Sequence, residues 1–126
     1  MKKAINTNKA PLPVGPYNQA VLVDKTLYIS GQVALNPENN ELIQGSIEDE
    51  THQIMKNIKS ILNEVGLDFK NVVRSKIYLT DMNNFSKVNQ VYGSYFEKNH
   101  EPARTTLEVS GLPLGVDVEI DMIAVV

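Results

Sequence analysis

Apolar residues recur every three or four positions between Glu48 and Val65, which predicts an amphipathic helix with one face in a core. Ser46 precedes this segment as an N-cap residue, and Gly66 ends it. The acidic residues 48–50 suit the positive end of the helix dipole, so we interpret them as a helix start rather than as catalytic carboxylates. A second helix is predicted over Phe85–Lys98, where aromatic residues share one face.

Alternation of apolar and polar residues predicts the strands around these helices. The expected strands are a short one at Lys3–Asn6, a hairpin of Gln19–Val23 and Thr26–Ser30, an extension at 33–35, a strand at Val72–Leu79 and two strands within Pro102–Val126. The proline-rich segment Lys9–Tyr17 predicts an ordered loop. We therefore expect one α+β domain over residues 1–126, a two-layer sandwich with two helices on one face of a mixed, mostly antiparallel sheet.

The last two strands carry the most distinctive chemistry. We expect them to form an antiparallel hairpin through the turn at Ser110–Gly115, with Thr106 opposite Glu119 and Arg104 opposite Asp121. This register would place Arg104 diagonal to Glu119 and within side-chain reach, whereas a slip of one residue would separate them. The arginine could then form a structural ion pair or bind the carboxylate of a ligand, and the residues leave both open.

The final strand also has a continuous apolar face, formed by Val118, Ile120, Met122 and Ala124. We expect the helices to cover the other side of the sheet and leave this face exposed. An exposed apolar patch of this kind indicates an interface, so we predict a homo-oligomer.

Composition removes several classes of function. The chain has no cysteine, which excludes disulfides and thiolate catalysis, and its two histidines lack metal-ligand spacing, so no metal is expected. A net charge of −3 argues against binding of nucleic acid through a broad basic surface. No apolar run approaches the ~20 residues that span a bilayer, and Met1–Thr7 lacks a signal-peptide core, so we expect a cytoplasmic protein without membrane contact.

The remaining candidate groups are chemically mild. The sequence has no nucleophile elbow and no glycine-rich phosphate loop. It retains an arginine anchor, a nearby carboxylate, Tyr17 on a rigid loop, and Ser30 beside Gly31. Such a set could bind a small carboxylate and orient water, which fits either a ligand-binding protein or an enzyme for a reaction with a low barrier.

Six short motifs occur in a characteristic order. They are GPY at Gly15–Tyr17 followed by Gln19, SGQ at Ser30–Gln32, VNQVYGSYF at Val88–Phe96, PAR at Pro102–Arg104, Leu112–Pro113, and VEID at Val118–Asp121. With these motifs the whole chain resembles the Rid/YjgF family, most closely its reactive intermediate deaminase A subgroup.

The resemblance implies a chorismate-mutase-like fold that trimerises around a central β-barrel, with ligand sites in clefts between subunits. It also implies hydrolysis of reactive enamines and imines, such as 2-aminoacrylate, 2-iminobutanoate and 2-iminopropanoate, to 2-oxo acids and ammonia without a cofactor. Such intermediates are released by pyridoxal-phosphate enzymes acting on serine and threonine, which would place the protein in amino-acid metabolism and the control of metabolite damage.

The resemblance also assigns roles to residues. Arg104 would bind the substrate carboxylate, and Glu119 would hold the attacking water and accept its proton. The other residues expected to contact substrate are Tyr17, Ser30, Gly31, Asn89 and Thr106. The last of these stands where relatives often carry cysteine, and Gly111 and Asp121 also depart from the usual pattern, which affects the expected substrate preference more than the reaction class.

Two other functions remain open at this point. The protein could sense 2-oxo acids through Arg104 without turnover, because relatives have been linked to purine and isoleucine metabolism. It could also be a ribonuclease or translation inhibitor, as some relatives have been described, although the acidic balance and the lack of a histidine pair argue against this activity.

Overall fold

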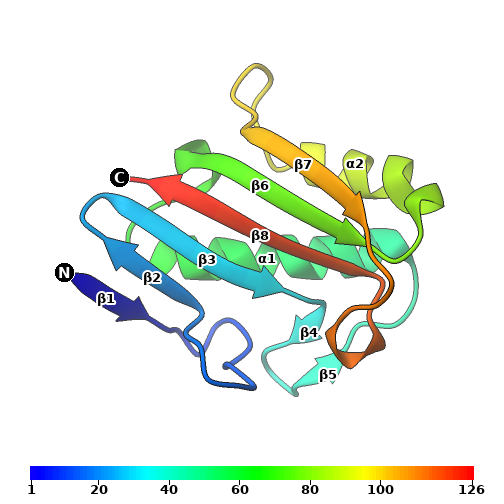
Figure 1. Cartoon of the computed structure of the whole chain (residues 1–126), viewed down its shortest axis with the longest axis horizontal. Coiled ribbons are helices and arrows are strands. Elements are labelled where there is room, and N and C mark those ends of the chain that lie inside the picture. Colours follow the sequence, from blue (N-terminus) through cyan, green and yellow to red (C-terminus); the bar gives the residue numbers. More distant parts are fainter.

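Two helices pack against one face of a six-stranded sheet in the computed structural model, which describes residues 1–126 (Figure 1). The strands of this sheet in spatial order are β1 (Lys2–Ile5), β2 (Ala20–Val23), β3 (Thr26–Gln32), β8 (Val118–Val125), β6 (Val72–Leu79) and β7 (Ala103–Glu108). Only β6 and β7 run parallel. The predicted two-layer α+β architecture is therefore confirmed. Neither helix is both long and apolar enough to cross a membrane.

Helix α1 (Ile47–Glu64) begins where the sequence predicts. The Ser46 side chain accepts a hydrogen bond from the backbone N–H of Asp49 at 3.0 Å, as expected of an N-cap. Helix α2 (Phe85–Gly93) is shorter than predicted, because the chain leaves the helix after Gly93. Beyond that point Tyr95 and Phe96 pack edge-on against the ring of Phe69, so tertiary packing prevails over the helical pattern.

Shorter elements connect the main ones. A separate two-stranded sheet joins β4 (Leu35–Asn36) to β5 (Glu41–Leu42), and three 3₁₀ helices are η1 (Phe69–Asn71), η2 (Met82–Asn84) and η3 (Pro113–Gly115). The predicted hairpin of β2 and β3 is confirmed, with Val23 paired to Thr26 across a turn in which Asp24 adopts a φ of 51°.

The predicted hairpin of the last two strands is wrong. Strand β6 lies between β7 and β8, pairing in parallel with the first and antiparallel with the second. Arg104 is therefore opposite Ser75, and Glu119 is opposite Tyr78. The segment between β7 and β8 contains η3 and is long enough to pass around the end of β6, so adjacency in sequence does not impose pairing.

The apolar face of β8 is also different from the expectation. Its four residues are at most 1% exposed because they form part of the core between sheet and helices, rather than an outer patch. The outward side of β8 carries Glu119, Asp121 and Ile123 instead. We refer to the side of the six-stranded sheet away from the helices as the open face; it is turned toward the viewer in Figure 1.

Candidate functional site

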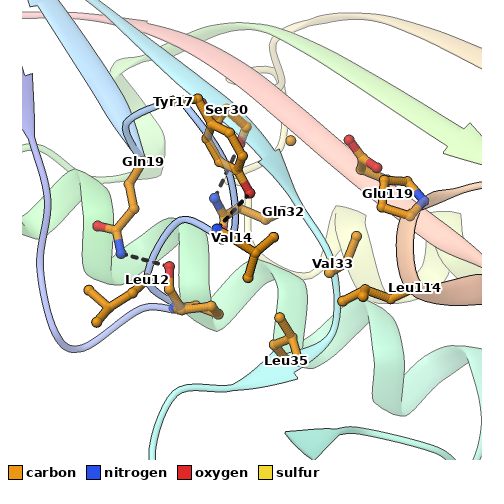
Figure 2. A pocket seen from close by; sticks show the side chains of 13 residues that line it. Leu12, Val14, Tyr17, Gln19, Ser30, Gln32, Val33, Leu35, Leu114 and Glu119 are labelled. Atoms are coloured by element: carbon orange, nitrogen blue, oxygen red, sulfur yellow. Dashed lines mark hydrogen bonds between the residues drawn. The ribbon is translucent and has the colours of Figure 1, made fainter. Parts of the chain in front are cut away.

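A cavity of about 320 Å³ lies beside the end of β3 and the start of β8 (Figure 2). It brings together three of the predicted site residues with the catalytic candidate Glu119: these are Tyr17, Ser30 and Gly31. Much of the remaining wall is apolar and comes from the 11–17 loop, from the residues after β3, and from η3. These apolar lining residues are Pro11, Leu12, Val14, Val33, Leu35, Pro113 and Leu114.

Gln19 holds the 11–17 loop in place beneath this cavity. Its side-chain amide nitrogen lies 2.9 Å from the carbonyl oxygen of Thr7, 3.2 Å from that of Ala10 and 2.8 Å from that of Pro11. Its side-chain oxygen accepts from the backbone N–H of Thr7 at 2.7 Å. Because Gln19 is 1% exposed, these bonds form away from competing water and stabilise the loop that carries Tyr17.

Most of the residues that line the cavity were not predicted as site residues, and Gln19 and Leu114 show why. The sequence signal for Gln19 is a polar residue immediately before the apolar strand AVLV, within a motif otherwise assigned to the ligand loop. Leu114 forms part of the wall from a left-handed backbone conformation with a φ of 62°. No sequence pattern indicates that conformation, because non-glycine residues rarely adopt it.

Ser30 presents its hydroxyl at the cavity with the proton already engaged. The Oγ donates to the backbone carbonyl of Asn18 at 2.6 Å, and the backbone N–H of Ser30 donates to the carbonyl of Gln19 at 2.9 Å. The remaining lone pairs of Oγ can accept from a ligand. Ser30 therefore suits an N–H donor better than it suits a ligand carboxylate.

Glu119 lies directly against Gly31. A Cβ atom placed on Gly31 would fall 2.0 Å from Oε2 of Glu119, so the carboxylate could not keep this position beside any other residue. The pairing of β3 with β8 is irregular at this point, between Ile29 and Gln32, and a glycine is common at such irregularities. The missing side chain of Gly31 therefore leaves the space in which the carboxylate sits.

The surroundings of Glu119 raise its pKa above the ordinary value of a glutamate. Partial burial is the main cause, since it disfavours the charged form, and the negative charge of Asp121 adds to the effect. A carboxylate with a raised pKa is a stronger proton acceptor, which is the property required of a general base.

Arg104 occupies a second cluster on the helix side of the sheet. Its guanidinium carbon lies 5.1 Å from the ring centre of Tyr92 and 5.5 Å from that of Phe85, both on α2. Asn89 lies four positions after Phe85 and three before Tyr92. This helical spacing places it on the same side of α2 as the two rings. Asn89 was predicted to contact substrate, and this role stays a prediction.

Thr106 belongs to the same side of β7, two residues beyond Arg104. Its hydroxyl is the single buried side-chain polar atom of the chain that has no hydrogen-bond partner. Leaving such a group unpaired costs about 1–3 kcal/mol. A group of this kind in a native protein calls for an explanation, such as a ligand or an ordered water that completes the bond.

The structure therefore separates the two predicted catalytic residues. Arg104 points to the helices and Glu119 to the open face, with β6 between their strands. The proposed contact between them within one chain is wrong, and so is the alternative of a structural ion pair between Arg104 and Glu119 or Asp121. The chain instead carries two partial sites, which we call the glutamate site (Tyr17, Ser30, Gly31, Glu119) and the arginine site (Phe85, Asn89, Arg104, Thr106).

Comparison with known proteins places this arrangement in a family. The sequence profile described as "Endoribonuclease L-PSP" matches residues 7–126. A mouse (Mus musculus) protein named 2-iminobutanoate/2-iminopropanoate deaminase is 48% identical over 125 residues, which cover 99% of this chain and 92% of that protein. The chain belongs to the Rid/YjgF family.

Solved structures of the Rid/YjgF family share the fold throughout. The Rid-family protein YyfA from Yersinia pestis has a TM-score of 0.97 at 43% identity and covers 100% of both chains. TdcF from E. coli, solved with bound serine, has a TM-score of 0.92 at 32% identity over 98% of each chain. The family resemblance read from the motifs is thus confirmed.

Proposed function

We propose that this Rid/YjgF protein hydrolyses imines of small 2-amino acids, such as 2-iminobutanoate and 2-iminopropanoate, to 2-oxo acids and ammonia. The enamine 2-aminoacrylate would enter the same reaction as a tautomer of 2-iminopropanoate. The observation that carries the proposal is the carboxylate of Glu119, which lies against Gly31 in a partly apolar cavity with a raised pKa. The similarity to the mouse deaminase supports the same reaction.

The chemistry requires orientation more than a powerful catalyst. The imine carbon is already electrophilic, so a positioned water can attack it and form a C–O bond while Glu119 accepts the proton. The protonated Glu119 then gives that proton to the nitrogen, which completes the carbinolamine. Glu119 next takes the hydroxyl proton and passes it to the nitrogen as the C–N bond breaks, so that ammonia and the 2-oxo acid form and the carboxylate is restored. Because Glu119 acts as a carboxylate, activity falls as the pH drops through its raised pKa.

The two partial sites match the two ends of such a substrate. Arg104 and the unpaired hydroxyl of Thr106 would bind the carboxylate, with Asn89 supporting the same cleft. Ser30 would accept a hydrogen bond from the imine N–H, and the backbone N–H of Gly31 would be available to the ligand. Tyr17 would close one side of the cavity. The serine bound to TdcF, also a small molecule with a carboxylate next to an amino-bearing carbon, supports a ligand of this class.

We propose that a complete site needs two copies of the chain. The carboxylate of the substrate is attached directly to the imine carbon, so its anchor and the water-activating group must face each other closely. In one chain Arg104 and Glu119 lie on opposite sides of the sheet. Arg104 of one copy would therefore meet Glu119 of another, in a homotrimer with its ligand clefts between subunits.

The open face supports an assembly of this kind. It exposes large apolar side chains on three strands, with Tyr28 50%, Leu107 45% and Val125 37% exposed. Packing three such faces together would bury them in a central barrel. The sequence analysis expected the interface on the opposite side of β8. The exposed apolar residues of the open face now support oligomerisation instead.

The direct test measures 2-oxobutanoate formed from freshly generated 2-iminobutanoate, after subtraction of the enzyme-free rate. Wild type should accelerate the reaction, and Arg104→Ala and Glu119→Gln should each lower kcat/KM by about 10²-fold or more. Glu64→Gln at the exposed end of α1 is the matched control and should retain full activity. If wild type gives no acceleration but still binds 2-oxobutanoate through Arg104, the protein is a carboxylate sensor rather than a deaminase.

The family description favours one other candidate, cleavage of RNA. A net charge of −3 provides little attraction for a polyanion, so we rank it below the deaminase. Cleavage of RNA by rigorously purified protein that persists in Arg104→Ala would support it.

A further inference from the structure

The guanidinium of Arg104 rests between two aromatic rings rather than beside a carboxylate. Its carbon lies within the range of a cation–π contact from both Tyr92 and Phe85. The acidic residues of β8, Glu119 and Asp121, lie beyond β6 and project from the opposite face of the sheet. The two rings therefore supply the local attraction that holds the cation.

The inner ring is itself fixed by a buried hydrogen bond. The hydroxyl of Tyr92 donates to Oγ of Ser75 at 2.8 Å, and the two residues are 4% and 0% exposed. Ser75 is also the residue paired directly with Arg104 between β6 and β7. The bond therefore ties the ring to the strand position beside the arginine.

We propose that Phe85 and Tyr92 are positioning residues for Arg104, with Ser75 holding the inner ring in place. The inference deepens the proposed function, because it rests on Arg104 as the carboxylate anchor. A cation–π contact does not use the N–H groups of the guanidinium as hydrogen-bond donors, so they remain available for a bidentate bond to a carboxylate. An acidic partner would occupy those same N–H groups and compete with the substrate.

The arrangement predicts which kinetic constant changes. A carboxylate anchor binds substrate and transition state alike, so a misplaced Arg104 should raise KM with little change in kcat. Loss of one ring should weaken binding about three- to tenfold, as expected for a single cation–π contact at a partly exposed site. Phe85 is the position to change, because it is 37% exposed, whereas replacing the buried Tyr92 would disturb the core.

The test is a double-mutant cycle on binding of 2-oxobutanoate, measured by titration calorimetry with wild type, Phe85→Leu, Arg104→Ala and the double variant. Phe85→Leu should raise Kd three- to tenfold, and Phe85→Trp should restore it. In the Arg104→Ala background, Phe85→Leu should have no further effect. An equal loss in both backgrounds would show that Phe85 contacts the ligand directly and would overturn the inference.

Tyr95→Leu is the matched control. Tyr95 lies two residues after the end of α2. Its ring packs against Phe69, and its hydroxyl lies 2.9 Å from Nδ1 of His52. The variant should lose thermal stability and keep the Kd of wild type. If it weakens binding as much as Phe85→Leu does, the effect is general destabilisation and the inference fails.

A measurement without ligand separates this inference from the proposed function. Ring currents from Phe85 and Tyr92 should shift the Arg104 side-chain proton resonances upfield, and Phe85→Leu should move them toward the values of an unstructured arginine. If the resonances are shifted but the protein binds no 2-oxobutanoate, the aromatic contacts are supported and the role of Arg104 as carboxylate anchor is contradicted. Unshifted resonances in wild type would overturn the aromatic contacts themselves.

Discussion

At the scale of single residues, the position of the Glu119 carboxylate depends on a glycine, Gly31, which has no side chain. Gly31 can be read from the sequence as a place of close approach, because it follows directly on a strand. The group that approaches it is the carboxylate of Glu119, which comes from a strand far along the chain. That partner depends on how β8 pairs with β3, so the sequence around Gly31 could not identify it.

Gly31→Ala tests this dependence. The added methyl group would collide with the carboxylate, and the flexible Glu119 side chain would have to move out of the cavity. We expect kcat of imine hydrolysis to fall by about 10²-fold, because a small misplacement of a catalytic group is costly. Circular dichroism should show a folded protein, and Gly93→Ala, which meets no atom within 4 Å, is the control. Full activity in Gly31→Ala would show that this position of Glu119 is not required.

At the scale of elements, local patterns predicted most helix and strand ranges, whereas α2 and the strand pairings depended on tertiary packing. The range of β6 was predicted residue for residue, and α1 to within one residue at each end, because alternation and capping are local signals. The predicted pairing of β7 with β8 was wrong. The turn after β7 carries no sequence signal for a parallel pairing with β6. The exposed apolar face expected on β8 was a separate error, because the strand pattern does not show which side of the sheet the helices cover.

Glu50 connects α1 to β8 and shows a second role for the acidic helix start. It is 7% exposed, and its Oε1 accepts from the backbone N–H of Asp117 at 3.4 Å. Burial, aided by the charge of Asp117, raises its pKa from 4.5 to about 7, although the bond from the Asp117 backbone opposes this. The protonated form is thus favoured by folding, and its stabilising effect is lost as the pH rises through about 7.

Glu50→Gln should remove this pH dependence while keeping an oxygen that can accept the same hydrogen bond. We expect the free energy of unfolding of the variant, taken relative to that of wild type, to increase by about 1–2 kcal/mol between pH 5 and pH 8.5. Urea denaturation at the two pH values measures the difference. Glu64→Gln should differ from wild type by the same amount at both. Parallel pH profiles for Glu50→Gln and wild type would contradict the raised pKa.

At the scale of the whole molecule, two partial sites lie on opposite sides of one sheet. The sequence motifs correctly indicated the family, because they occur in short segments. The roles assigned to individual residues remain predictions. The motifs could not show that a single sheet separates Arg104 from Glu119, since that follows only from the strand order. The open face, with its exposed apolar side chains, offers a surface through which copies could bring the two parts together.

The central claim is that Arg104 and Glu119 of one site come from different copies, and subunit complementation tests it most directly. Differently tagged Arg104→Ala and Glu119→Gln chains would be co-expressed, and mixed oligomers would be isolated by sequential affinity steps and verified by native mass spectrometry. Each variant alone should be inactive. Each verified mixed trimer would have both intact residues at one of its three interfaces and should therefore restore about one third of wild-type activity. Verified mixed oligomers that remain as inactive as the single variants would contradict the claim.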